Sequence, residues 1–199
     1  MKFIEPLVNN YRQLTKAIND QTTRVTVAAD GTTPSKGTIA EATLYAHEHE
    51  LSLAILIRPR MGDASYSDPE LKIMEADILA AQQLGADAII VAALTPDHQL
   101  DTEAMANLIA AAGGMSITFG TAVDDLADSD QADALKWLAD NGVERVLTHL
   151  TGKANTARLS RLNNIAQAAN LQLVVLSDDD AQSSQLNEQL NLSYFLQEK

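Results

Sequence analysis

Residues 82–94 read QQLGADAIIVAAL and contain the pattern that decides the fold: the end of a helix, a glycine and a short apolar run. The same order recurs in AAGGMSITFGTAV at 111–123 and in LADNGVERVLTHL at 138–150. Glycine just past a helix adopts a left-handed conformation at little steric cost. The apolar runs that follow, at 88–91, 116–119 and 145–147, are typical of strands buried in a parallel sheet.

Further elements continue this alternation along the chain. Strands are expected at 24–28, 53–57 and 173–176, and weaker strands at 3–4 and 194–196. Helices are expected over 39–50, 67–84 and 155–170, and two more begin near Asp101 and near Ser129 or Asp130. The alternation predicts an α/β protein, and about eight strands favour a compact (β/α)8 TIM-type barrel. An open doubly wound sheet is the alternative that periodicity leaves open.

Composition limits the class of protein. With 199 residues, 46% of them hydrophobic, the chain suits one globular domain over residues 1–199. The net charge of −13 argues against nucleic acid and anionic membranes as partners, because both bind basic surfaces. No apolar run reaches the roughly 20 residues of a membrane span, and the start lacks a secretory signal. We therefore expect a cytoplasmic protein, whose assembly into homo-oligomers stays open.

Several reactive groups and motifs are missing from the sequence. There is no cysteine, which excludes disulfides, Cys-ligated metal centres and a thiolate nucleophile. The patterns GxSxG, GxGxxG and GxxxxGK[ST] are also absent. Copper(I) prefers thiolate and thioether ligands, and the five methionines are scattered. The residues therefore assign neither a reaction nor a metal site, and whether the chain is an enzyme stays open.

The segment ILIRPRMGDASY at 55–66 is the most unusual loop, since it follows a predicted strand and holds two of only seven arginines. Ligands of parallel α/β proteins gather at the carboxyl ends of strands. In an extended segment Arg58 and Arg60 point to the same side, so both could clamp one anion. The alternative is a structural set of ion pairs with Asp63, Glu70 or Asp77.

Other strand ends carry weaker candidates. His149 follows the strand at 145–147, where it is either an acid, base or metal ligand or a hydrogen-bonded rim residue. Together with Asp63 and Asp124 it forms the set of catalytic candidates. The loop ADGTTPSKG at 29–37 could present backbone N–H groups to an anion, and SDDD at 177–180 could bind a metal through carboxylates or be simply solvated.

Long segments resemble the CutC family of copper-homeostasis proteins. They are TTPSKGTI (32–39), YAHEHELSLAILIRPRMGDASYS (45–67), IMEADILAAQQLGADAIIVAALTPDHQLD (73–101), ITFGTAVDD (117–125) and WLADNGVERVLTH (137–149). The resemblance implies a (β/α)8 barrel, a cytoplasmic bacterial protein, and copper as the associated metal, without a defined reaction. Positions shared with the family are Arg58, Arg60, Asp63, Tyr66, Asp77, Thr118, Asp124 and Thr148, and all but Asp124 are taken as ligand-binding candidates.

The chain also departs from the family pattern. Where the family has R-I-E-L-C, this sequence reads RVTVA, so Thr26 and Ala28 replace an acid and a cysteine. FIEPL lacks the cysteine of the first strand, Gly120 replaces a histidine, and SDDD stands in place of P-G-G-G. Two hypotheses follow: a CutC-type binding module whose copper-handling residues are partly lost, or a barrel enzyme acting on a small anionic carboxylate or phosphate.

Overall fold

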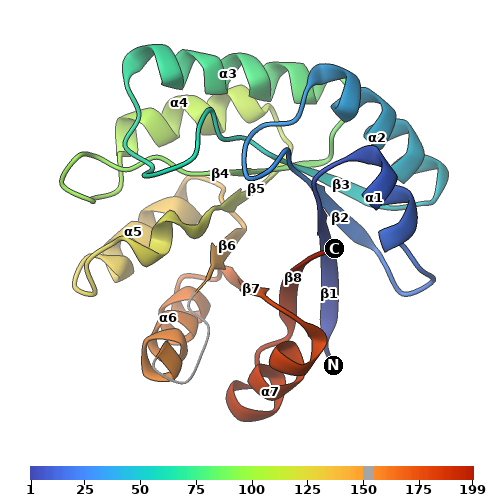
Figure 1. Ribbon diagram of the computed structural model, residues 1–199. Coiled ribbons are helices and arrows are strands. Elements are labelled where there is room, and N and C mark those ends of the chain that lie inside the picture. Colours follow the sequence, from blue (N-terminus) through green and yellow to red (C-terminus); the bar gives the residue numbers. More distant parts are fainter. Residues whose placement is uncertain (150–154) are drawn as a thin grey trace.

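The computed structural model describes residues 1–149 and 155–199 (Figure 1). Its strands are β1 (Phe3–Val8), β2 (Arg24–Val27), β3 (Ser52–Leu56), β4 (Ala88–Val91), β5 (Ser116–Phe119), β6 (Arg145–Thr148), β7 (Gln172–Ser177) and β8 (Tyr194–Glu198). Its helices are α1 (Tyr11–Ala17), α2 (Lys36–Glu48), α3 (Asp68–Gln83), α4 (Thr102–Ala112), α5 (Gln131–Asp140), α6 (Thr156–Ala168) and α7 (Asp180–Leu190), with a 3-10 turn, η1, at Thr121–Asp124.

The strands close into a barrel in which each strand pairs in parallel with the next and β8 pairs with β1. Closure leaves no free sheet edge. The expected (β/α)8 barrel is therefore confirmed, and the open doubly wound sheet is wrong. All strands are parallel, so their carboxyl ends form one rim of the barrel. The loops after β1 to β4 and the turn η1 after β5 lie at this rim.

Local sequence explains the helix ends. Asp101 accepts a hydrogen bond from the N–H of Ala104 at 2.9 Å and thereby caps α4, as expected. Gly113 ends the same helix at φ 56°, the left-handed conformation that glycine adopts without strain. The sequence underestimated the lengths of the first and last strands, since β1 and β8 are longer than expected. It also did not predict helix α1. Only Leu14 of α1 is buried, so seven residues show no helical periodicity.

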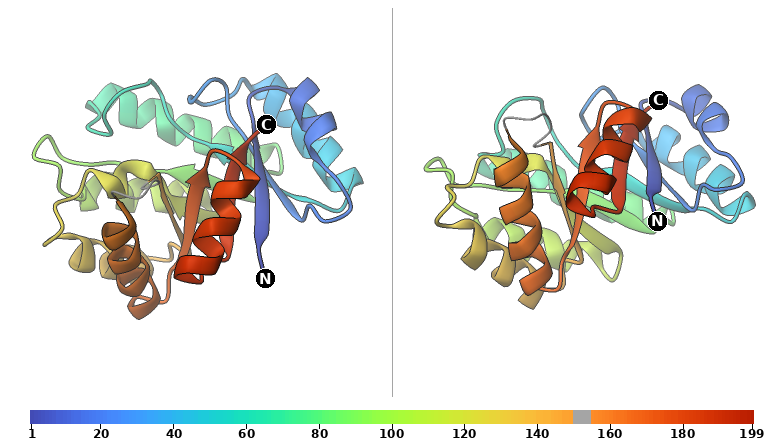
Figure 2. Two further views of the ribbon diagram at one scale, coloured as in Figure 1. Left: turned by 60° about the horizontal axis from the view of Figure 1, so that its bottom comes forward. Right: turned by 90° about the horizontal axis from the view of Figure 1, so that it is seen from below.

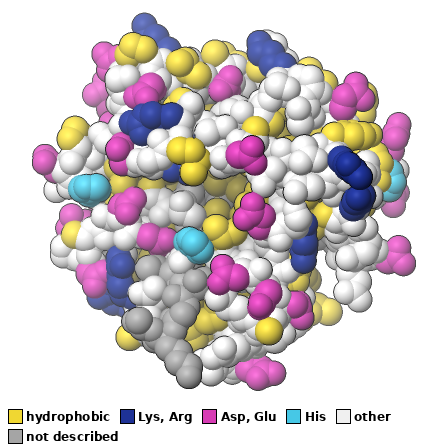
Figure 3. Space-filling model, in the orientation of Figure 1, with side chains coloured by type: hydrophobic (Ala, Val, Ile, Leu, Met, Phe, Trp, Pro, Cys, Tyr) yellow, Lys and Arg dark blue, Asp and Glu magenta, His cyan; other side chains and the backbone are white. Residues whose placement is uncertain are grey.

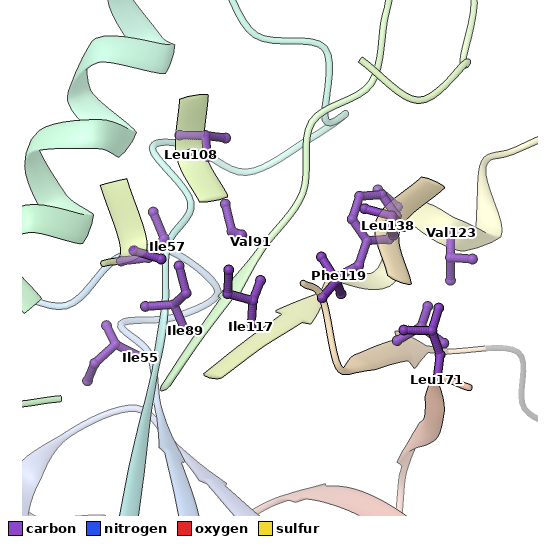
Figure 4. Packing of buried hydrophobic residues seen from close by; sticks show 14 of the residues in the cluster. Ile55, Ile57, Ile89, Val91, Leu108, Ile117, Phe119, Val123, Leu138 and Leu171 are labelled. Carbon is purple, nitrogen blue, oxygen red and sulfur yellow. The ribbon is translucent and has the colours of Figure 1, made fainter. Parts of the chain in front are cut away.

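Two apolar layers hold the barrel together. The larger layer lies between strands and helices, where residues such as Ile55, Ile89, Ile117 and Phe119 point outward from consecutive strands (Figure 4). A smaller cluster of Ile90, Leu147, Val174 and Leu196 fills the inside of the barrel. Strand residues alternate between the two layers, which explains why the strands read as continuous apolar runs.

The last helix packs beside the first strand, as both views in Figure 2 show. Lys2 Nζ donates to Asp180 Oδ1 at 2.6 Å and to Ser184 Oγ at 2.8 Å, which joins the two ends of the chain. Within the described part of the chain, no helix is long and apolar enough to cross a membrane.

Candidate functional site

A pocket of about 180 Å³ opens at the carboxyl rim of the barrel. Inward-facing apolar side chains form its floor: Leu7, Leu56, Ile90, Leu147, Leu176 and Leu196. Figure 3 shows this face with hydrophobic side chains in a central hollow and acidic side chains around it. Most polar groups of the lining come from the loops above, so the mouth combines an apolar base with a few directed polar groups, the usual composition of a small-molecule site.

Arg58 lines this pocket and is held by the neighbouring loop. Its N–H donates to Thr33 Oγ1 at 2.9 Å, and the N–H of Thr33 donates to its carbonyl at 2.9 Å. Its Nη2 donates to the carbonyl of Gly62 at 2.5 Å. Arg58 therefore lies at the mouth, and contacts with the loops after β2 and β3 hold it there.

Arg60 lies outside that pocket and makes structural contacts. Its Nε donates to Glu70 Oε1 at 2.6 Å, and its Nη2 donates to the carbonyl of Ser65 at 2.8 Å and approaches Asp63 Oδ1 at 3.3 Å. Its guanidinium carbon also lies 5.2 Å from the ring centroid of Tyr66. The structure thus separates the two arginines: Arg58 lines the mouth, and Arg60 forms the ion pairs that the alternative described.

Asp63 belongs to the Arg60 network. It accepts a hydrogen bond from the N–H of Ser65 at 3.0 Å, and that bond, together with Arg60, lowers the pKa of its carboxyl. Tyr66, in contrast, lines the pocket beside Arg58. Burial raises the pKa of its phenol, while Arg58 opposes the shift. Tyr66 is therefore a neutral hydroxyl at the mouth, and Asp63 is a charged group outside it.

Asp124, Thr148 and His149 form a second cluster beside the mouth. Thr148 Oγ1 donates to Asp124 Oδ1 at 2.5 Å, and the N–H of His149 donates to Asp124 Oδ2 at 2.7 Å. Arg158 Nη2 donates to the carbonyl of Asp124 at 3.0 Å. Burial raises the pKa of the Asp124 carboxyl, and the hydrogen bonds from Thr148 and His149 oppose that shift. These contacts join η1 to the end of β6, and none of the three residues lines the pocket.

The two remaining candidates also lie outside the mouth pocket. Asp77 is on α3, where burial raises the pKa of its carboxyl and Thr33 and Lys36 lower it. Thr118 points into the barrel interior, and its Oγ1 is buried without a hydrogen-bond partner among the described residues. Both side chains are better explained by packing than by contact with a ligand at the mouth.

The pocket also contains residues that the sequence did not put forward as ligand-binding candidates, although Thr26 and Gly120 were noted as departures from the family pattern. Thr26, Thr121 and Asp125 supply two hydroxyls and a carboxylate, and Gly120 lies among them. A Cβ on Gly120 would meet Ile90 Cγ2 at 3.6 Å and Ala92 Cβ at 3.7 Å, which are ordinary contacts. The alternation of strand residues could have identified Thr26, because every second residue of a barrel strand points inward. Asp125 lies in a loop rather than a strand, so alternation could not have identified it.

The residues at the mouth do not fit copper. No group of three or more His, Asp or Glu residues that could hold a metal occurs in residues 1–149 or 155–199, and the sequence has no cysteine. Met61 supplies a single thioether, which lies against Gly31. In the SDDD segment Asp179 caps α7 and Asp180 pairs with Lys2. Copper(I) prefers soft thiolate and thioether ligands, and none of these places offers more than one.

The fold and the pocket define a small (β/α)8 barrel protein with a ligand-sized cavity at the carboxyl ends of its strands. A model of the CutC family matches residues 3–190, and the chain belongs to that family. A CutC family protein of Enterococcus faecalis is 43% identical over 144 residues, 70% of this chain and 69% of that protein.

Solved structures agree with this assignment. The structure of a copper homeostasis protein CutC from Streptococcus agalactiae has 31% identity and a TM-score of 0.92, and the match covers 99% of this chain and 98% of that one. An HpcH/HpaI aldolase from Desulfitobacterium hafniense has a TM-score of 0.69 at 10% identity, which shows a shared fold alone. The family assignment made from the sequence is therefore confirmed, and it favours the CutC hypothesis over the metabolic enzyme.

Proposed function

We propose that this chain acts in copper homeostasis, the role named for its S. agalactiae relative, by binding a small organic molecule at the barrel mouth. The ligand has an apolar body that covers the leucine-rich floor and an anionic group that faces Arg58. The observation that carries the proposal is the position of Arg58 in the pocket lining, above an apolar floor. In this proposal copper is not bound by side chains of the mouth.

The size and polarity of the pocket support a small ligand. Its volume of about 180 Å³ lies below the range of roughly 300–1,000 Å³ that is usual for drug-sized ligands. Among the described residues, Arg58 is the only lysine or arginine in the lining, while Tyr66 and Thr121 offer hydroxyls. A guanidinium binds carboxylate oxygens in a bidentate geometry, so a small carboxylic acid with an apolar body suits this arrangement.

Ligand binding is tested with a panel of small carboxylates of increasing apolar size, measured by thermal shift and calorimetry. We expect a saturable rise in melting temperature for some members and its loss in Arg58→Ala. Arg12→Ala, on the exposed side of α1, is the matched control that keeps the response. A panel without any response, or a response unaffected by Arg58→Ala, would contradict the proposal.

Copper binding is tested separately, by titration of copper(I) against a chromophoric chelator. We expect no stoichiometric site tighter than about micromolar, because a copper(I) site needs thiolate or clustered thioether ligands. A tight site that disappears in Met61→Leu would place copper at the mouth and would overturn the exclusion of copper from it.

A further inference from the structure

A second pocket lies at the amino-terminal end of the barrel, opposite the mouth. It has a volume of about 410 Å³, and its lining includes Glu5, Arg24, Glu144, Arg145 and Tyr194. Glu5, Arg24, Arg145 and Tyr194 lie near the starts of β1, β2, β6 and β8, respectively, and Glu144 directly precedes β6. The pocket therefore shares no lining residue with the mouth.

The buried charges in this pocket do not balance. Arg145 Nη2 donates to Glu5 Oε2 at 2.9 Å, and Arg24 Nε lies 3.4 Å from Glu5 Oε1. Thr26 Oγ1 donates to the same Oε1 at 2.5 Å. The side chains of Glu5, Arg145 and Arg24 are 8%, 11% and 18% exposed, so all three are largely removed from water. Two guanidinium groups thus share one buried carboxylate.

Part of each guanidinium has no partner. Arg24 Nε and Nη2 and Arg145 Nε are buried donors without a hydrogen bond among the described residues. Arg24 Nε lies in an ion pair with Glu5 and Arg145 Nη2 donates to the same carboxylate, so Arg24 Nη2 and Arg145 Nε are the donors left for the oxygens of an oxoanion. Burial is the largest cause that lowers the pKa of Arg24; Glu5 opposes that shift, and the nearby positive charge of Arg145 adds to it.

One other carboxylate faces the pocket. Glu144 lines its exposed side and accepts a hydrogen bond from Ser116 Oγ at 2.5 Å. Its negative charge acts on Arg24 from the solvent side. Since Glu144 is exposed and Glu5 is buried, water screens Glu144 more strongly. The inner part of the pocket therefore remains positive.

We propose that this pocket binds a small oxoanion or carboxylate on the guanidinium groups of Arg24 and Arg145. The anion supplies the second negative charge that Glu5 alone cannot provide. Binding requires both side chains to turn toward the anion, because their unpartnered N–H groups are buried. Phosphate and acetate represent this class of anion, and the cavity of about 410 Å³ is large enough for either.

Calorimetry with inorganic phosphate and with acetate, at constant ionic strength, tests this proposal. We expect saturable binding to the wild-type protein. Thr26→Glu places a second carboxylate next to the two arginines, so phosphate affinity should fall at least tenfold. Glu144→Gln removes an opposing charge at an exposed position, so phosphate affinity should rise severalfold. The second variant keeps the test decisive should the first fail to fold.

Three results would overturn the proposal. Absence of phosphate and acetate binding to the wild-type protein is the first. Equal affinities in the wild type and in Glu144→Gln would show that the pocket does not contain the site. Binding that disappears in Arg58→Ala would assign the anion to the mouth instead.

Discussion

Arg60 Nε donates to Glu70 Oε1 at 2.6 Å, and this ion pair ties the loop after β3 to the first turn of α3. The other oxygen of the same carboxylate accepts a hydrogen bond from the N–H of Ser67, the residue that caps α3, at 2.7 Å. One glutamate therefore caps the helix and holds the loop whose earlier residue, Arg58, lines the mouth. The geometry of the mouth depends on a contact outside it.

Glu70→Gln is expected to lower the melting temperature at neutral pH, because glutamine loses the ionic attraction to Arg60. Hydrogen bonds from Ser67, followed by that from Arg60, lower the pKa of Glu70 below 4.5. The stabilisation is thus complete above pH 4.5 and is lost as the pH falls through the folded-state pKa. Thermal melts between pH 7 and the acid limit measure this, with Glu75→Gln on the same helix as the control. A deficit that does not shrink in acid contradicts the assignment.

Asp124→Asn should destabilise the protein by about 1–3 kcal/mol, because an amide cannot accept from both Thr148 and the N–H of His149. Burial raises the pKa of Asp124, so the folded state binds a proton more tightly than the unfolded state. This residue's contribution to stability therefore increases as the pH falls through the folded-state pKa toward 3.8. Denaturant unfolding at several pH values checks both effects. The exposed neighbour Asp125, changed to asparagine, should leave unfolding within about 0.5 kcal/mol of the wild type.

Gly120→Ala should be tolerated, and Gly120→Leu should block the mouth. The backbone of Gly120 has φ −73°, which any residue adopts, and its Cβ would have ordinary contacts. Alanine should change the unfolding free energy by less than about 1 kcal/mol. Leucine would extend into the pocket and abolish carboxylate binding while the protein stays folded. Ligand titration with circular dichroism distinguishes the two variants, and undiminished binding by Gly120→Leu would place the ligand elsewhere.

Glu5→Gln should lower the free energy of unfolding by about 3–5 kcal/mol, because it leaves two buried guanidinium groups without a countercharge. The measurement is urea unfolding at low salt. Glu188→Gln, on the exposed side of α7, should change little. A loss below about 1 kcal/mol for Glu5→Gln would show that solvation by water or the charge of a bound anion already compensates for the loss of Glu5.

The sequence predicted the repeating unit because the signals of each unit are local. A capping residue such as Asp101, a glycine such as Gly113 and the apolar run between 116 and 119 act within a few residues of one another. The short helix α1 was not predicted, because Leu14 alone among its residues is buried. Local patterns therefore predicted about eight strands and favoured a barrel, and the family resemblance, which depends on whole segments, was confirmed.

Only the tertiary structure showed that Arg58 lines the mouth while Arg60 forms structural ion pairs. Both residues occur in the same short segment, and an extended backbone would place them on one side. Glu70, ten residues further along, instead binds Arg60, while Thr33 from the previous loop binds the backbone of Arg58. The same holds for the buried pair of Arg24 and Arg145, which lie far apart in sequence and share Glu5. By itself the sequence determined the alternation of strands and helices, since its signals are short-range, and the family resemblance pointed to the barrel. Only the closure of the barrel decided which charges meet.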